Sequence, residues 1–246
     1  MTTTIALVLI VLLAFAVEAA AGFGSTVVTV TLAAQLMPVD AVLARFVPVN
    51  VLLSLYLVAR YRRAVDLRLL ARRVLPWMGA GMAAGLAIAH FASPGWIKFA
   101  FALFVVTLSA LELRALRRGA SAARLGAATA GSALLGAGVV HGMFACGGPL
   151  VVWVVGREVD DKATFRATLS ALWLVLNLVL VVGYVLGDQL DGGTLKESAF
   201  LVVPLVAGVF VGERVHDRLS PARFRASVFL LLLIAASVLL FRSVLS

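Results

Sequence analysis

Of the 246 residues, 63% are hydrophobic and 13% are charged, whereas soluble domains carry roughly 25% charged residues. One water-soluble globule cannot bury that much apolar surface, so the composition predicts a protein surrounded by lipid. The formal charge of +9 does not indicate nucleic acid, because the 21 Lys and Arg lie mostly in short stretches between apolar runs. There they are typical of topology signals and of contacts with lipid headgroups. Cys146 is the only cysteine, which excludes an intramolecular disulfide and a multi-cysteine metal site.

Eight apolar segments divide the chain, most of them close to the roughly 20 residues that a spanning helix needs. They cover residues 4–36, 39–60, 74–92, 95–113, 125–156, 165–187, 198–216 and 222–241. Residues 5–21 also resemble a cleavable signal peptide, but no Lys or Arg precedes them and the apolar run continues, so we expect them to be retained. Segments one and five exceed one span, and each is interrupted by small residues. The interruptions are Gly22-Phe23-Gly24-Ser25 and Cys146-Gly147-Gly148-Pro149.

The two halves of the chain resemble each other. Gly81-xxx-Gly85 and Ser93-Pro94 recur as Gly208-xxx-Gly212 and Ser220-Pro221 at an offset of 127 residues, and Asp40 and Arg45 recur as Asp161 and Arg166 at an offset of 121. We predict two four-segment repeats, residues 1–118 and 125–246, joined by a basic linker at 119–124 within one membrane domain. The glycine pairs also suit close helix packing. Each Ser-Pro suits an N-cap followed by proline at the first helical position.

The basic residues favour one topology. If all eight segments crossed the membrane, 12 of the Lys and Arg would lie on one side and nine on the other, a weak bias for the positive-inside rule. If segments one and five are re-entrant hairpins, 17 lie in the cytoplasm and four outside. The hairpin model leaves three full spans in each half, so the second repeat is inverted relative to the first, as in many transporters.

Each interruption leaves backbone N–H and C=O groups at membrane depth, where they need a protein-walled cavity or a ligand. A new half-helix begins after each break, and its positive dipole end favours an anion. We therefore predict that both breaks face one midplane site for a small anion; the alternative is that they only kink two long helices. The residues predicted to bind the anion are Gly22, Gly24, Ser25, Thr26, Arg45, Asn50, Gly142, Cys146, Gly147, Gly148, Pro149 and Arg166.

Two ionisable residues stand one helical turn before the breaks, Glu18 in the first half and His141 in the second. At that depth they are candidates for proton coupling or substrate contact, although a histidine bonded to a neighbouring helix is an equal alternative. Arg45 and Arg166 have the geometry to hold an oxyanion with two hydrogen bonds; the alternative is that they extend to the headgroups.

Asn50 and Asn177 are polar residues inside apolar helices, which either line the same cavity or bond a neighbouring helix. Cys146, at a predicted hairpin tip, is expected to serve as a small residue and not as a nucleophile. No His, Asp or Ser arrangement around it is legible in the sequence, so no catalytic residue and no metal site are predicted.

These runs also resemble a known family, over nearly the whole chain. Gly22-Phe23-Gly24-Ser25 followed by Pro38 and Ala41-xx-Ala44, Gly142-xxxx-Gly147-Gly148-Pro149-Leu150, Phe165-Arg166-Ala167-Thr168-Leu169 and Pro204-xxx-Gly208-xxx-Gly212 are similar to motifs of the TauE/SafE sulfite exporters. The resemblance implies export of a small sulfur-containing anion, such as sulfite or an organosulfonate, across the cytoplasmic membrane. It implies no redox cofactor and no ATP hydrolysis, and the chain contains no P-loop pattern.

The sequence thus predicts an all-α polytopic protein of the inner membrane, with two inverted four-helix repeats whose first helix is broken or re-entrant. The predicted function is a secondary transporter that exports an anion by alternating access, with lipids and the anion as partners and no cofactor. Exposed apolar faces would meet lipid or pair two copies of the chain. Two other classes remain as alternatives: an intramembrane enzyme acting on a lipid or peptide, and a passive anion channel.

Overall fold

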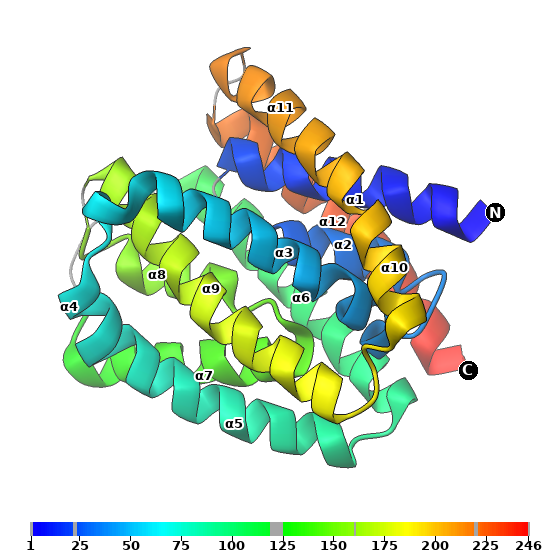
Figure 1. Cartoon of the computed structure of the whole chain (residues 1–246). Helices are drawn as coiled ribbons and strands as arrows, with labels where there is room; N and C mark the ends of the chain where they lie inside the picture. Colours follow the sequence, from blue (N-terminus) through cyan, green and yellow to red (C-terminus); the bar gives the residue numbers. More distant parts are fainter. Residues whose placement is uncertain (1, 22–23, 119–124, 160, 219–220, 246) are drawn as a thin grey trace. The chain divides into compact units, whose positions relative to one another are not determined.

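A computed structural model describes residues 2–21, 24–118, 125–159, 161–218 and 221–245, and every regular element in these ranges is helical (Figure 1). The linker at 119–124, Gly22, Phe23 and Ser220 lie outside them. The α-helices are α1 (Thr2–Ala21), α2 (Ser25–Ala33), α3 (Val39–Tyr61), α4 (Leu67–Leu69), α5 (Leu75–Phe91), α6 (Pro94–Arg118), α7 (Ala127–Phe144), α8 (Gly148–Val155), α9 (Lys162–Leu186), α10 (Gly192–Phe200), α11 (Val202–Arg218) and α12 (Pro221–Leu245). A 3-10 turn, Arg62–Ala64, follows α3, and a π-helical turn, Leu70–Val74, joins α4 to α5.

The eight predicted segments are present, and the two long ones are each divided in two, as α1 with α2 and α7 with α8. Two segments begin earlier than predicted. Segment three begins at Leu67 instead of residue 74, because the Asp66 carboxylate accepts a hydrogen bond from the Leu69 N–H (2.9 Å) and starts a helix among arginines. Segment seven begins at Gly192 instead of residue 198, because Asp191 caps the Thr194 N–H in the same way (2.7 Å).

The helices form two compact units that do not follow the sequence halves. Unit 1 contains residues 1–43, 92–121 and 199–246, and unit 2 contains residues 44–91 and 122–198. Within unit 1, α1 packs on α11 and α6 packs on α12; within unit 2, α5 packs on α7. Each unit therefore draws helices from both halves of the sequence, and the broken helix of one half lies against the third helix of the other half.

In unit 2 the chain reverses at the break. Helices α5 and α7 run in the same direction, since Gly81 lies against Leu135 and Gly85 against Val139. After α7 the chain folds back, which places Gly147 against the carbonyl of Ala137. It then returns to the end where α7 began, since residues 157–168 and 62–73 meet there through Arg73–Glu158 (2.7 Å) and Asp66–Thr168 (2.9 Å). Segment five thus forms a helical hairpin within its unit, as the re-entrant model requires.

Unit 1 repeats this arrangement. Helices α1 and α11 run in the same direction, since Gly208 lies against Leu12 and Gly212 against Ala16. Gln35, which follows α2, donates a hydrogen bond to the Ala235 carbonyl (3.1 Å) late in α12. The end of α2 therefore returns to the end of the unit at which both chain termini lie (Figure 1).

Glycines let these helices approach closely. A Cβ added at Gly81 would overlap the Leu135 carbonyl oxygen and come within 3.0 Å of the Gly138 Cα, and a Cβ at Gly208 would overlap the Leu12 carbonyl oxygen. Since Gly208 follows Gly81 by the predicted offset of 127, the same register recurs in both units. The small-xxx-small pairs therefore serve helix packing, as in other membrane proteins.

Alanine at Gly81 is expected to lower the free energy of unfolding by about 1–3 kcal/mol, because the added methyl group forces α5 away from α7. Gly79, two residues earlier on the same helix, is the matched control, since a Cβ there meets nothing within 4 Å. Gly79→Ala should be neutral or slightly stabilising. Thermal unfolding of both variants in detergent measures the difference, and equal stability would contradict the close approach.

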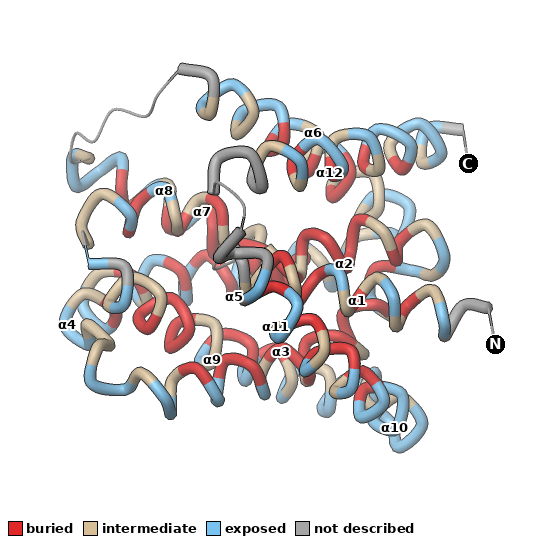
Figure 2. The backbone as a smooth tube through the Cα atoms, turned by 90° about the horizontal axis from the view of Figure 1, so that it is seen from above, coloured by how far each residue is buried: buried red, intermediate tan, exposed pale blue. Residues whose placement is uncertain are grey.

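The lipid-facing surface is extensive. Seven helical stretches in the described ranges are long and apolar enough to cross a membrane by length and composition. They are Val39–Ala64, Leu67–Phe91, Pro94–Leu116, Ala127–Phe144, Ala163–Leu186, Gly192–Gly212 and Ala226–Val244. Figure 2 shows exposed positions along these helices, and large apolar side chains such as Leu178, Val203 and Ile234 occupy them. The chain is therefore a multi-pass membrane protein.

The hairpin in unit 2 predicts which loops share a side of the membrane. In a Cys146→Ala background, cysteines at Arg68 and Asp161 should both react with an impermeant thiol reagent from the cytoplasmic side, where the basic residues concentrate. A cysteine at Thr194, beyond the far end of α9, should react only from the other side. Labelling of positions 68 and 161 from opposite sides would contradict the hairpin.

Candidate functional site

The break in unit 2 is built by a left-handed residue and a glycine. Ala145 ends α7 with φ 52°, and its N–H bonds the His141 carbonyl (2.7 Å). A Cβ added at Gly147 would overlap the Ala137 carbonyl oxygen and lie 3.2 Å from the His141 Cβ. Helix α8 then begins at Gly148 with Pro149 in its first turn, as expected for a helix start. The chain that leads into α8 therefore lies against α7 at Ala137 and His141.

A buried polar cluster lies beside this break, formed by Asn50 and Ser54 of α3, His141 of α7 and Asn177 of α9. Asn177 Nδ2 donates to Asn50 Oδ1 (3.0 Å), and Ser54 Oγ lies 3.5 Å from the same oxygen. This bond joins α3 to α9, the second segments of the two predicted repeats.

His141 is the polar residue of this cluster that most needs a partner. It is 1% exposed, and its ring stacks on Trp173 with centroids 5.5 Å apart. The Asn177 amide lies beside the ring, but among the described residues no hydrogen bond of normal geometry reaches either ring nitrogen or Asn177 Oδ1. Even if one ring nitrogen shared a proton with Asn177, the other would remain without a partner. Buried polar atoms without partners are costly and point to a ligand or water.

At the break in unit 1, a side chain of the protein lies at the start of the returning helix. Gly24 adopts φ 107°, which only glycine adopts readily, and α2 begins at the next residue. The Ser25 N–H, the first of α2, donates to a Glu18 carboxylate oxygen (3.3 Å). A carboxylate of the protein itself thus lies at the positive end of α2, where we predicted a substrate anion. Ser25 is buried and Thr26 is half-buried.

Further along α2, two buried hydroxyls were not predicted. Thr29 and Thr31 are 0% exposed, and within the described part of the chain their oxygens have no hydrogen-bond partner. A threonine inside a helix normally bonds a carbonyl one turn earlier, so these oxygens also favour a polar occupant. The sequence did contain a signal for such an occupant, because four hydroxyl side chains in one apolar segment are unusual: Ser25, Thr26, Thr29 and Thr31.

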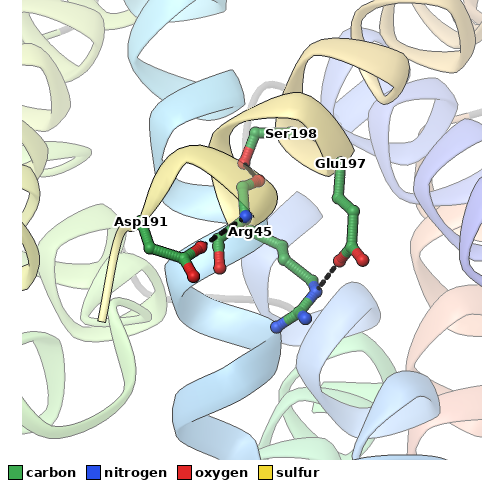
Figure 3. A network of polar contacts seen from close by, with 5 residues as sticks. Arg45, Asp191, Glu197 and Ser198 are labelled. Carbon is green, nitrogen blue, oxygen red and sulfur yellow. Dashed lines mark hydrogen bonds and ion pairs between the residues drawn. The ribbon is translucent and has the colours of Figure 1, made fainter. Parts of the chain in front are cut away.

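The predicted arginines lie at helix ends in unit 2 and pair with other groups there. Arg45 Nε donates to the Glu197 carboxylate of α10 (Figure 3), and the Arg45 side chain is 23% exposed. Asp191, the cap of α10, lies close to the same arginine; the Thr194 N–H, and to a smaller extent Arg45, lowers the pKa of its carboxyl group. Arg166 lies over the ring of Tyr61, 5.8 Å from its centroid. Neither guanidinium belongs to the buried polar cluster.

Two further residues predicted to bind the anion, Gly142 and Cys146, are buried in the packing of the hairpin. Gly142 faces α5, because a Cβ there would overlap the Met82 carbonyl oxygen and come within 2.9 Å of the Leu86 N. Its missing side chain serves the contact between α5 and α7. Cys146 is 3% exposed, at the tip of the hairpin. Within the described ranges no group of three or more His, Cys, Asp or Glu is placed to hold a metal ion.

Helices long and apolar enough to cross a membrane, two helical hairpins and buried polar groups at the breaks are together typical of a polytopic membrane transporter. The chain belongs to the sulfite exporter TauE/SafE family, whose model matches residues 7–239. It is also 29% identical over 164 residues to the probable inner membrane transporter protein TsaS of Comamonas testosteroni, a match that covers 65% of this chain and 66% of that protein, slightly less than two thirds of its length. No solved structure matched the chain. The chain is therefore a multi-pass membrane protein of the sulfite exporter TauE/SafE family.

Proposed function

We propose that this protein exports a small sulfur oxyanion, sulfite or an organosulfonate, by alternating access. The observation that carries the proposal is the same in both units: a helical hairpin whose short returning helix begins at the break, one turn from an ionisable residue. The amide end of such a helix binds anions without a fixed cation, and the family model is that of sulfite exporters. That the two breaks share one pocket stays a prediction of the sequence.

Both halves of the candidate site have the chemistry for an oxyanion. In unit 2, the first amides of α8 and the amide of Asn177 provide donors in a buried setting, where each hydrogen bond is stronger than in water. In unit 1, the α2 amides and the hydroxyls of Thr29 and Thr31 provide others. Arg45 is a candidate for attracting the anion at the helix end and not for holding it at the breaks, since it is partly exposed and paired with Glu197.

Proteoliposomes test the proposed function. Purified protein should give saturable uptake of labelled sulfite or methanesulfonate and faster exchange when unlabelled anion is present on the other side. Exchange of this kind requires a carrier. Conduction that rises linearly with concentration would indicate a passive channel instead, and the absence of flux for both anions would overturn the proposal.

Glu18→Gln should remove most of the pH dependence of methanesulfonate exchange. Methanesulfonate keeps one charge throughout the range, so its pH dependence must come from the protein. Protonation of Glu18 removes the charge that competes with the substrate for the amide end of α2, so wild-type exchange should rise as pH falls. Glutamine has no charge at any pH, so the variant should be fast and nearly independent of pH. Unchanged pH dependence would remove Glu18 from the coupling mechanism.

A further inference from the structure

The charge available around the buried polar cluster of unit 2 limits which anion it can hold. No Lys, Arg, Asp or Glu is among the buried residues that the structure describes. The described arginines of α3 and α9 in unit 2 lie away from the cluster: Arg45 is paired with Glu197, Arg60 is exposed beside Tyr56 and Tyr61, and Arg166 lies over Tyr61. The groups beside the break are instead neutral: an imidazole, two amides, a serine hydroxyl and the first amides of α8.

Neutral donors and one helix end suit a single negative charge. A helix amino end carries roughly half a positive charge, and the cost of removing an ion from water rises with the square of its charge, about fourfold from a monoanion to a dianion. A dianion in this cluster would have no cation to offset that cost. A monoanion would be partly balanced by the α8 dipole and would also meet the unpaired ring nitrogens of His141.

The unpaired ring nitrogens of His141 also favour a ligand that carries a proton. A neutral imidazole has one donor and one acceptor nitrogen. If its N–H is directed to Asn177 Oδ1, the acceptor nitrogen is left for a ligand that carries a hydroxyl group. Hydrogen sulfite carries both features, an O–H that can donate to the imidazole and oxygens that can accept from the α8 amides. Sulfite dianion has no O–H, and a sulfonate has the oxygens and the single charge without the O–H.

We infer that this cluster takes the transported anion as a monoanion, hydrogen sulfite or a sulfonate, with His141 as the acceptor for the hydroxyl of hydrogen sulfite. The inference rests on the proposed function and adds the charge state of the substrate. Transport then selects against sulfite dianion, sulfate and other doubly charged oxyanions of the same size.

Wild-type protein tests the charge requirement without any variant. The ratio of sulfite flux to methanesulfonate flux should fall as pH rises, by up to about tenfold for each pH unit above the point where hydrogen sulfite loses its proton. Titration of the protein cancels in this ratio, because it affects both fluxes. Methylphosphonate, which has nearly the shape of methanesulfonate, should compete at mildly acidic pH as a monoanion and stop competing at alkaline pH as a dianion.

A ratio that stays constant with pH, or equal competition by sulfate and by dianionic methylphosphonate, would overturn the inference while leaving anion transport intact. Loss of all flux would instead count against the proposed function. His141→Leu separates the second part: it should raise the KM for sulfite about tenfold more than the KM for methanesulfonate, which has no hydroxyl to donate. An equal change for both anions would remove the assigned role of His141.

Discussion

Replacing Gly147 by alanine should reduce anion exchange on the order of tenfold to a hundredfold. The added Cβ would overlap the Ala137 carbonyl oxygen and press on the His141 Cβ at 3.2 Å, and both neighbours are fixed by α7. The chain reversal must therefore move, and with it the first amides of α8. Displacement of binding groups by about 1 Å is enough for an effect of this size. Initial rates of methanesulfonate exchange, at equal amounts of reconstituted protein, measure the loss.

Gly136→Ala is the matched control for this variant. Gly136 also lies in unit 2, on α7, but a Cβ at this position meets nothing within 4 Å, so the substitution should leave exchange unchanged. Overpacking at Gly147 should also cost about 1–3 kcal/mol of stability, which thermal unfolding records separately. Full exchange in Gly147→Ala would show that the geometry of this break does not matter for transport.

The interruptions of the two long segments were predictable because glycine and proline act locally. Gly24 requires a left-handed conformation and Pro149 lacks an N–H, so each disturbs a helix whatever surrounds it. The early starts of segments three and seven were missed for a related reason. Their caps, Asp66 and Asp191, are local signals too, but they stand among charged or glycine residues that a search for apolar runs excludes.

Contacts across the fold could not be derived from the sequence. Arg45 pairs with Glu197 across 152 residues, and Asn177 with Asn50 across 127. The repeats were visible in the sequence, but knowing that two segments correspond does not show that their side chains touch. That depends on which repeat-related helices lie together, as α3 and α9 do in unit 2 and α6 and α12 do in unit 1. Side-chain periodicity does not specify such pairing.

Asn50 and Asn177 offer a test that separates helix bonding from substrate binding. Leucine at Asn50 alone leaves the Asn177 amide buried without its partner, and leucine at Asn177 alone does the reverse. Each single variant should lose stability, by about 1 kcal/mol given the typical strength of hydrogen bonds between membrane helices. The double variant removes both polar groups, so its stability should recover most of that loss. Thermal unfolding in detergent of all four proteins completes the cycle.

Transport should not recover in the double variant, and this outcome distinguishes substrate binding from helix bonding. A hydrogen bond to an anion contributes about 1.5–3 kcal/mol, so loss of the amide next to His141 should weaken binding by about ten- to a hundredfold. If the two asparagines only join α3 to α9, the stable double variant should exchange anions at the wild-type rate. A stable double variant with a raised KM would instead place the Asn177 amide in contact with the anion, since restored packing cannot account for the missing affinity.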